Sequence, residues 1–321
     1  MHTTASSVLQ ESYDIFFVFD VCWGNINGDP DMAGAPRYHP ETMKAVVSSV
    51  RQKRSIRNYI SGPTVDDPLS IYFQNGSVLN NLHQEVYEDL GYTLPEKNEK
   101  VPDPIQESIA QKLCIEKADI RMMGAALGAS RFPAKSIRGP VQLFWLSSIN
   151  TVRIINNSIT RCCVTTEEDE LKAQTIGKNS KLNYALFLGI CTISKHDAAV
   201  TGMMYKDLDM IFEALDMMFE YERSEMRGLV TTQGVVAFKH QNGRRNRYAK
   251  LQDMKDRVCI TSLHEPPETF KHYSVIVDAR DLPDSVSLIR SDFPVKYWHG
   301  LYSPFSSLRA AKNAENPVQT T

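Results

Sequence analysis

The clearest pattern in the chain is an alternation of apolar residues that predicts a β-strand at residues 13–23. One face of this strand carries six apolar side chains, Tyr13, Ile15, Phe17, Phe19, Val21 and Trp23. The opposite face carries Phe16 and Val18 between Asp14 and Asp20. Because both faces hold apolar residues, we expect a central strand of a sheet that is covered on both sides.

Helical and strand patterns alternate along the rest of the chain. Residues 43–60 predict an amphipathic helix with Thr42 as its N-cap, three valines on one stripe and Gly62-Pro63 at its end. Residues 206–222 repeat the helical spacing. Apolar segments predict strands at 141–149, 183–194, 229–239 and 273–278, with a bulge at Gly234.

The order strand, helix, strand, strand, helix, strand predicts an α+β fold with a ferredoxin-like, RRM-like βαββαβ core. We assign this core to residues 12–61, 138–150 and 182–292. Two insertions interrupt it, a mostly helical one at 62–137 and a strand-rich one at 151–181, where residues 159–166 are rich in β-branched side chains. Residues 303–321 are expected to be a flexible tail.

Composition limits the class of protein. The chain has 321 residues, 42% of them apolar, which excludes a disordered chain, a collagen and a coiled coil. None of the six cysteines forms a CxxC pair, so a zinc site has no support and buried reduced thiols are expected. The N-terminus has no signal-peptide pattern and no apolar run is long enough to span a bilayer, so a soluble cytoplasmic protein is expected.

Common catalytic motifs do not occur. The sequence contains no GxxxxGK[ST], GxGxxG or GxSxG motif, and no two histidines are four residues apart on one helix. We therefore predict neither a cofactor nor a metal site. Asp29 and Asp31 fall in a long Asn-, Gly- and Pro-rich loop at 24–42 that does not fit a calcium loop. They are interpreted as Asx-turn residues that shape the loop, with a role as general bases or metal ligands in RNA cleavage as the alternative.

Charge is segregated although the total is only −2. Residues 37–57 hold six Lys or Arg against one Glu, residues 239–257 hold seven against two Asp, and residues 64–119 hold four against eleven acidic residues. Lys53 and Arg57 share a helix face that Arg54 adjoins, which suggests contact with an anionic ligand. The alternative is that these cations complement the C-terminal helix dipole.

Several segments resemble one known family. They are residues 19–31 with Gly34 and Pro36-Arg37, the helix end 53–59, and the shorter matches 137–142, 159–161, Phe219-Glu220 with Arg223, Arg227-Gly228 and 238–240. In this order they are similar to the CRISPR-associated RNA-binding backbone subunits of Cascade, the Cas7 family, in its type I-C branch. The similarity runs from about residue 12 to 292, most of the chain.

The resemblance implies a hand-like subunit with a palm, helical fingers at 62–137 and a β-hairpin thumb at 151–181. It implies no catalytic residue and contacts to guide RNA, mainly to phosphate and sugar, from Asn25, Asn27, Arg37, Lys53, Arg54, Arg57, Arg121, Arg138, Thr160, Arg161, Lys178 and Lys181. Gly28, Asp29, Asp31 and Gly34 are expected to shape the loop at the RNA or at the joint between subunits. Met122 and Met123 are candidates for stacking on bases, with ordinary core methionines as the alternative.

The implied partners are guide crRNA, target DNA paired with that guide, further copies of the chain, the cap and guide-processing subunit, and the large subunit of Cascade, with no membrane. Two alternatives stay open. One is a metal-dependent RNA endonuclease subunit that uses a loop aspartate, and the other is a generic RNA-binding protein.

Overall fold

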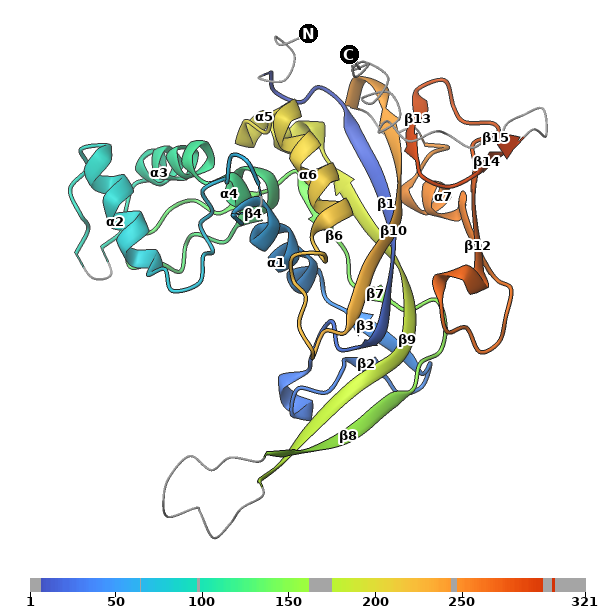
Figure 1. Ribbon diagram of the computed structural model, residues 1–321. Coiled ribbons are helices and arrows are strands. Elements are labelled where there is room, and N and C mark those ends of the chain that lie inside the picture. The colour runs from blue at the N-terminus through green and yellow to red at the C-terminus, as the bar shows by residue number, and fades with distance from the viewer. Residues whose placement is uncertain are drawn as a thin grey trace, which may run out of the picture.

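A central antiparallel sheet organises the chain in the computed structural model, which describes residues 7–63, 65–96, 99–161, 175–243, 247–296 and 302–303. The elements that build its core are β1 (Ser12–Gly24), α1 (Ser49–Ile60), β6 (Val141–Leu143), β9 (Thr175–Ile193), α6 (Tyr205–Met217) and β10 (Leu229–His240). Their order is the predicted strand, helix, strand, strand, helix, strand, in a mixed α+β fold (Figure 1).

Strand β1 lies in the middle of this sheet. The strand order is β13 (Val286–Ser291), β10, β1, β9, β6, and every neighbouring pair is antiparallel. Residues Ser12–Val21 of β1 are all buried, which confirms the central strand predicted from its two apolar faces. The β1–β10 register shifts beside Gly234, where Val18 pairs with Gly234 and Phe19 pairs with Thr232, so the bulge is also confirmed.

The two faces of the sheet are covered by different elements. Helices α1 and α6 pack on the face that carries Ile15, Phe17 and Phe19. The other face, with Phe16 and Val18, packs against α7 (Leu251–Asp256), β11 (Val258–Ser262), β12 (Tyr273–Asp278) and β14 (Val295–Lys296). The last three strands and β15 (Tyr302–Ser303) form a separate sheet in the order β11-β12-β14-β15. Strand β12 lies at the predicted residues.

A small sheet precedes α1 and corrects the predicted start of that helix. Residues Lys44–Val47 form β3, which pairs with β2 (Tyr38–His39) and β7 (Leu146–Ser147), so the helix begins at Ser49. Ser48, not Thr42, is the N-cap, and its hydroxyl accepts a hydrogen bond of 3.2 Å from Arg51 N. Valines at 46 and 47 satisfy both patterns, and the available partner strand decided between them. The predicted strand at 141–149 is correspondingly divided into β6 and β7.

Residues between α1 and β6 form a helical lobe with its own core. Its helices are α2 (Leu79–Asp89), α3 (Asp103–Glu116) and α4 (Ala118–Met123), and its core includes Tyr87, Ile109, Leu113 and Phe132. The chain returns to the sheet through β4 (Gly124–Ala125) and β5 (Ile137–Arg138). Figure 1 shows this lobe projecting from the side of the sheet.

A two-stranded arm projects from another edge. Strand β8 (Ile154–Arg161) pairs with residues 175–182 of β9, which is much longer than the predicted strand at 183–194 (Figure 1). The arm and the helical lobe lie on the same side of the sheet (Figure 1). Residues 162–174, which include part of the predicted β-branched run, and the predicted tail beyond Ser303 lie outside the described residues.

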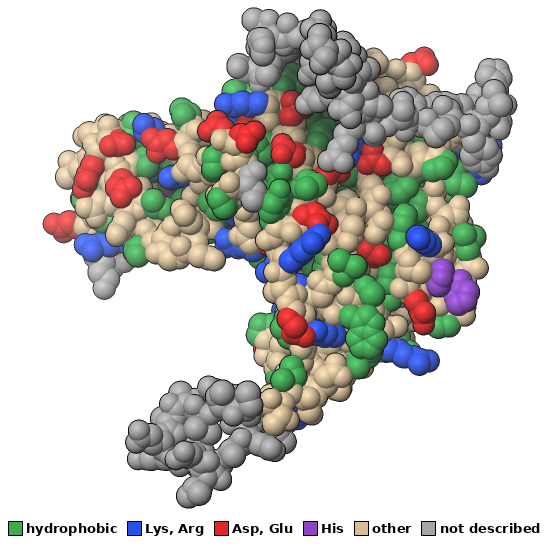
Figure 2. All heavy atoms as spheres, in the orientation of Figure 1, with side chains coloured by type: hydrophobic (Ala, Val, Ile, Leu, Met, Phe, Trp, Pro, Cys, Tyr) green, Lys and Arg blue, Asp and Glu red, His purple; other side chains and the backbone are tan. Residues whose placement is uncertain are grey.

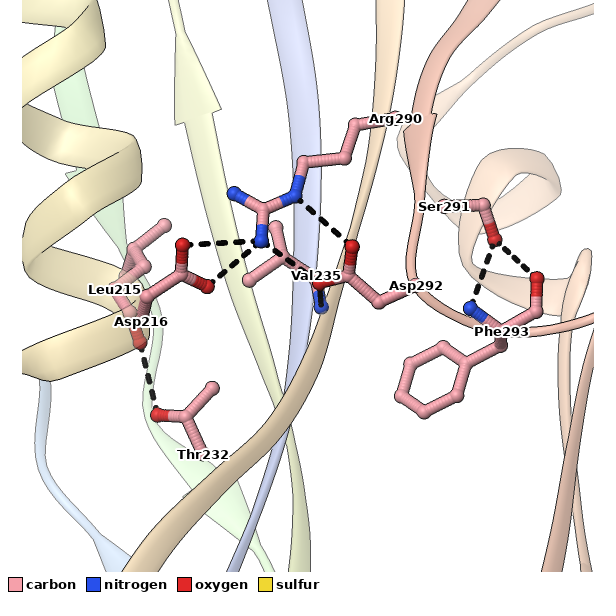
Figure 3. A network of polar contacts seen from close by, with 8 residues as sticks. All are labelled: Leu215, Asp216, Thr232, Val235, Arg290, Ser291, Asp292 and Phe293. Atoms are coloured by element: carbon pink, nitrogen blue, oxygen red, sulfur yellow. Dashed lines mark hydrogen bonds and ion pairs between the residues drawn. The ribbon is translucent and has the colours of Figure 1, made fainter. Parts of the chain in front are cut away.

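Two further features complete the fold. Helix α5 (Lys195–Thr201), which sequence patterns did not predict, follows β9 and is capped by Ser194. Arg290 of β13 fastens the sheet to α6, because its Nη2 donates to both carboxylate oxygens of Asp216 at 2.8 and 3.0 Å and to Asp292 at 2.7 Å (Figure 3). Asp292 in turn accepts from Val235 N at 2.9 Å. In the described ranges, no helix has the length and apolar character needed to cross a membrane.

Candidate nucleic-acid interface

The loop after β1 is held by its own asparagines and aspartate. Asn25 is buried, and its Nδ2 donates to Gly34 O at 2.7 Å, while Asn27 Oδ1 accepts from Ser48 N at 2.7 Å. Asp29 caps the short 3₁₀ helix Pro30–Met32 by accepting from Asp31 N at 3.2 Å. These contacts fit the predicted loop-shaping role of Asp29. Asn25 and Asn27 also have a structural role, because their side chains hold the loop in place.

Two glycines permit this loop path. A Cβ on Gly24 would lie 1.7 Å from the carbonyl oxygen of Arg227, so any larger residue would push the two backbone segments apart. Gly34 has a φ of +79°, in the left-handed region that side chains disfavour. Gly28 forms an isolated bridge to Pro36, and Asp31 is exposed at the tip of the loop. The loop is therefore ordered by the crossing of Gly24 with the chain after α6.

The basic end of α1 faces the helical lobe and is mostly occupied. Arg54 Nη1 donates to Phe73 O at 2.7 Å. Arg57 forms an ion pair of 2.8 Å with the fully buried Asp119 and lies 4.6 Å above the Phe73 ring. Asp119 also accepts from Tyr72 N at 2.7 Å. Arg54 and Arg57, predicted to meet an anionic ligand, thus fasten the helical lobe to the palm.

Arg121 has the same kind of role. It makes a bidentate pair with Asp207 of α6, at 2.9 and 2.8 Å, and donates to the carbonyls of Cys114 and Ile115 at 3.1 Å. Its side chain is 9% exposed. The predicted RNA contact at Arg121 is not available in this structure, because the guanidinium is buried and four of its five N–H groups already bond protein oxygens.

Lys53 differs from its neighbours on α1. Its Nζ approaches only a carbonyl, Met123 O at 3.4 Å, and within the described part of the chain it forms no ion pair. Burial lowers the pKa of Lys53, and the nearby Arg57 lowers it further. An anion placed beside Lys53 would offset both effects, so this position favours a negatively charged ligand.

The other predicted contacts divide by exposure. Arg138 is 77% exposed and makes only a 3.4 Å pair with Asp197, while Lys178 and Thr160 are exposed on the arm. Lys181 is bonded to Glu225. Arg37 is partly exposed and lies 3.4 Å from Asp29. Arg161 belongs to β8, and its side chain lies outside the described residues.

Met122 and Met123 are 0% and 2% exposed and belong to the main hydrophobic core. They are not placed to stack on a base, and their burial favours the alternative, core methionines. Sequence patterns therefore do not distinguish a methionine wedge from a core methionine at these positions.

One polar cluster was missed at the level of sequence. Glu222, in the turn after α6, pairs with Arg51 and Arg227 at 2.5 Å each and accepts from Ser55 at 2.9 Å and Asn58 at 2.6 Å. Burial alone would raise the pKa of Glu222, but the Arg51 hydrogen bond and the charges of Arg51 and Arg227 hold it below its ordinary value. Arg51 Nε also donates to Ile26 O at 2.8 Å, so the cluster joins α1 to the loop. Its members are up to 171 residues apart, which no local pattern reveals.

The molecule is hollowed between the lobe and the arm (Figure 2). Figure 2 shows Lys and Arg side chains along the inner edge of this hollow, near the central sheet, and acidic side chains gathered on the outer part of the lobe. Among the described residues, no cluster of three or more His, Cys, Asp or Glu is arranged to bind a metal ion. The polar side chains described above for this site are mainly those of lysine, arginine and asparagine.

Comparison with known proteins identifies one family. The model of the family "CRISPR-associated protein Cas7" matches residues 11–278. No curated protein matches the chain.

Solved structures include three similar chains. A chain titled "CRISPR RNA-guided surveillance complex, pre-nicking" is 14% identical, over 75% of this chain and 82% of that one, with a TM-score of 0.43. A chain from a "CRISPR RNA-guided surveillance complex" is 13% identical over 74% and 72%, with a TM-score of 0.40. A chain from a type III-B Cmr-beta complex bound to cognate target RNA is 9% identical over 71% and 61%, with a TM-score of 0.38.

Proposed function

The chain belongs to the CRISPR-associated Cas7 family, and we propose that it is the guide-RNA-binding backbone subunit of a type I-C Cascade complex. The observation that carries the proposal is the family match across residues 11–278, which takes in the central sheet except its edge strand β13, together with the lobe and the arm. In this proposal the subunit polymerises along crRNA and presents it for pairing with target DNA. Base pairing, not the protein, then selects the target sequence.

The geometry supports separate roles for the core, the lobe and the arm in RNA binding. The ferredoxin-like, RRM-like core acts as the palm, the lobe at 62–137 as fingers and the arm at 151–181 as the thumb. Lys53, Arg37, Arg138 and Lys178 are the proposed phosphate contacts, since they are the predicted cations with the weakest protein partners. The basic inner edge of the hollow (Figure 2) suits a single strand whose phosphates follow the palm.

The proposed partners are crRNA, neighbouring copies of the chain, the cap and guide-processing subunit, and the large subunit, in the cytoplasm. We propose no catalytic role. In support, the carboxylate of Asp29 is engaged by Asp31 N and Arg37, which suits a residue that shapes a loop. Cleavage of complementary RNA in magnesium that Asp31→Ala abolishes would instead favour the endonuclease alternative.

The experiment is assembly of the purified full chain on a type I-C crRNA, followed by size-exclusion chromatography with light scattering. We expect several copies per guide, in a regular ratio, with an affinity that falls steeply with salt. Addition of the type I-C cap subunit should improve assembly, whereas a cap subunit from another Cascade type should not. A chain that stays monomeric with both RNA and cap subunit would contradict the proposal.

A further inference from the structure

The small sheet β2-β3-β7 has an outer face that the functional prediction did not use. Strand residues alternate between faces, and Ala45, Val47 and Leu146 point into the main core. The adjacent residues Val46 and Ser147 pair across the strands and share the opposite, outer face. Arg37 and Trp145 immediately precede core-packed residues of β2 and β7, so they lie on this outer face too.

Trp145 is the largest group on that face and is 59% exposed. The guanidinium carbon of Arg37 lies 6.0 Å from the centre of the Trp145 ring, at the outer limit of a cation–π contact. The Arg37 side chain is 29% exposed, although its Nε is buried without a hydrogen-bond partner among the described residues. The indole therefore presents a broad exposed surface beside a guanidinium whose exposed part can meet a ligand.

The charge around Trp145 selects among possible occupants. The eight residues of β2, β3 and β7 include Lys44 and His39 but no Asp or Glu, and the nearest hairpin turn adds only Glu41. Asp29 opposes Arg37 through one contact of 3.4 Å. A single exposed indole among cations suits a nucleobase with its phosphate, because bases stack on aromatic rings while cations hold the backbone.

We propose that Trp145 is a base-stacking residue: a nucleobase of the bound single-stranded RNA lies on its indole, and Arg37 and Lys44 contact the adjoining phosphate. This inference rests on the proposed RNA-binding function and adds a specific contact that neither the charge pattern nor the family match assigns. It places one base of the guide on the outer face of the small sheet.

Two measurements test it on the full chain. In the first, Trp23→Phe with Trp298→Phe leaves Trp145 as the sole tryptophan, and indole emission is followed while a 35-mer oligouridylate is added. We expect stacking to reduce the emission. An abasic 35-mer, which offers the same phosphates without bases, should bind with little change in emission.

The second measurement compares RNA affinities by fluorescence anisotropy of a labelled 35-mer. Trp145→Ala should weaken binding by about tenfold, equivalent to ~1.4 kcal/mol, with an unchanged salt slope because no phosphate contact is lost. Trp145→Phe should restore most of the affinity. Tyr248→Ala is the matched control, because Tyr248 is 66% exposed, has Arg247 4.5 Å above its ring, and belongs to none of the strands of the small sheet.

Each result decides something. If the unmodified chain binds RNA while Trp145→Ala binds equally well, the inference is wrong and the proposed function stands. An emission change that follows protein concentration without RNA would assign Trp145 to a contact between copies and overturn the inference. If the unmodified chain binds no RNA with or without its cap subunit, the proposed function fails first and the inference fails with it.

Discussion

The cations at the junction of the central sheet and the helical lobe differ from Lys53 and Lys178, although both sets look alike in the sequence. Arg57 and Arg121 each meet a carboxylate, Asp119 or Asp207, that is at most 1% exposed. Lys53 and Lys178 meet none among the described residues. A charge that is already paired inside the protein stabilises the fold, whereas an unpaired one is available to a ligand. Experiments that measure stability and RNA binding separately test this difference.

The largest effect is expected at the junction. Asp119→Ala should lower the free energy of unfolding by ~3–5 kcal/mol, because Arg57 would be left buried without its counter-charge and Tyr72 N without its acceptor. Urea denaturation followed by circular dichroism measures this. Asp67→Ala, at an exposed aspartate of the same lobe, is the control and should change little. A stable Asp119→Ala variant with weakened RNA binding would reverse the comparison.

The Glu222 cluster should give the next largest effect. Glu222→Gln removes a charge that Arg51 and Arg227 hold, so the free energy of unfolding should fall by ~1.5–3 kcal/mol at pH 7. The pKa of Glu222 is lowered on folding, from an ordinary value of 4.5. The stability it contributes is therefore complete above that value and lost as pH falls through the folded pKa.

Denaturation of the two proteins from pH 7 to pH 3 checks this sign. The gap between wild type and Glu222→Gln should narrow only at the acidic end. Glu225→Gln, at a side chain that is 70% exposed, is the control. A gap that widened as pH fell would refute the assignment.

Substitution of Lys53 or Lys178 should weaken RNA binding and leave the stability of the fold unchanged. Lys53→Ala and Lys178→Ala should each reduce the slope of log affinity against log salt by ~0.7, the value for one lost phosphate contact on a single strand. The free energy of unfolding should change by less than ~0.5 kcal/mol in each variant. Lys135→Ala, at an exposed lobe lysine paired with Glu107, should alter neither. An unchanged salt slope for both lysines would remove them from the interface.

The smallest stability effect is expected at Arg138. Its pair with Asp197 is long and solvent-exposed, so Arg138→Ala should change the free energy of unfolding by less than ~0.5 kcal/mol. If Arg138 contacts RNA as Lys53 and Lys178 are proposed to do, the same variant should weaken RNA binding in the anisotropy assay. Loss of stability without loss of binding would instead give Arg138 a structural role like that of Arg57 and Arg121.

Sequence patterns located the elements whose periodicity was unambiguous. The strand at 13–23, the strand at 229–239 with its bulge, and the strand at 273–278 follow from their local runs of apolar and β-branched residues, because a strand buried in a sheet must place apolar side chains against the core. The helix predicted at 43–60 starts six residues later, at Ser49, and ends at the predicted residue. Residues 44–47 fit either element until the partner strand at 146–147 is known. Helix α5 was missed because its seven residues are too short to establish a period.

The α+β order of elements, the family resemblance and the uneven distribution of charge can all be read from the sequence. Which charges remain available depends on the folded chain, since Arg57 and Asp119 are 62 residues apart and Arg121 and Asp207 are 86 apart. The difference comes from the range over which each interaction acts. Periodicity and capping act between near neighbours in the chain, whereas an ion pair depends on which distant residues the packed core brings within 3 Å.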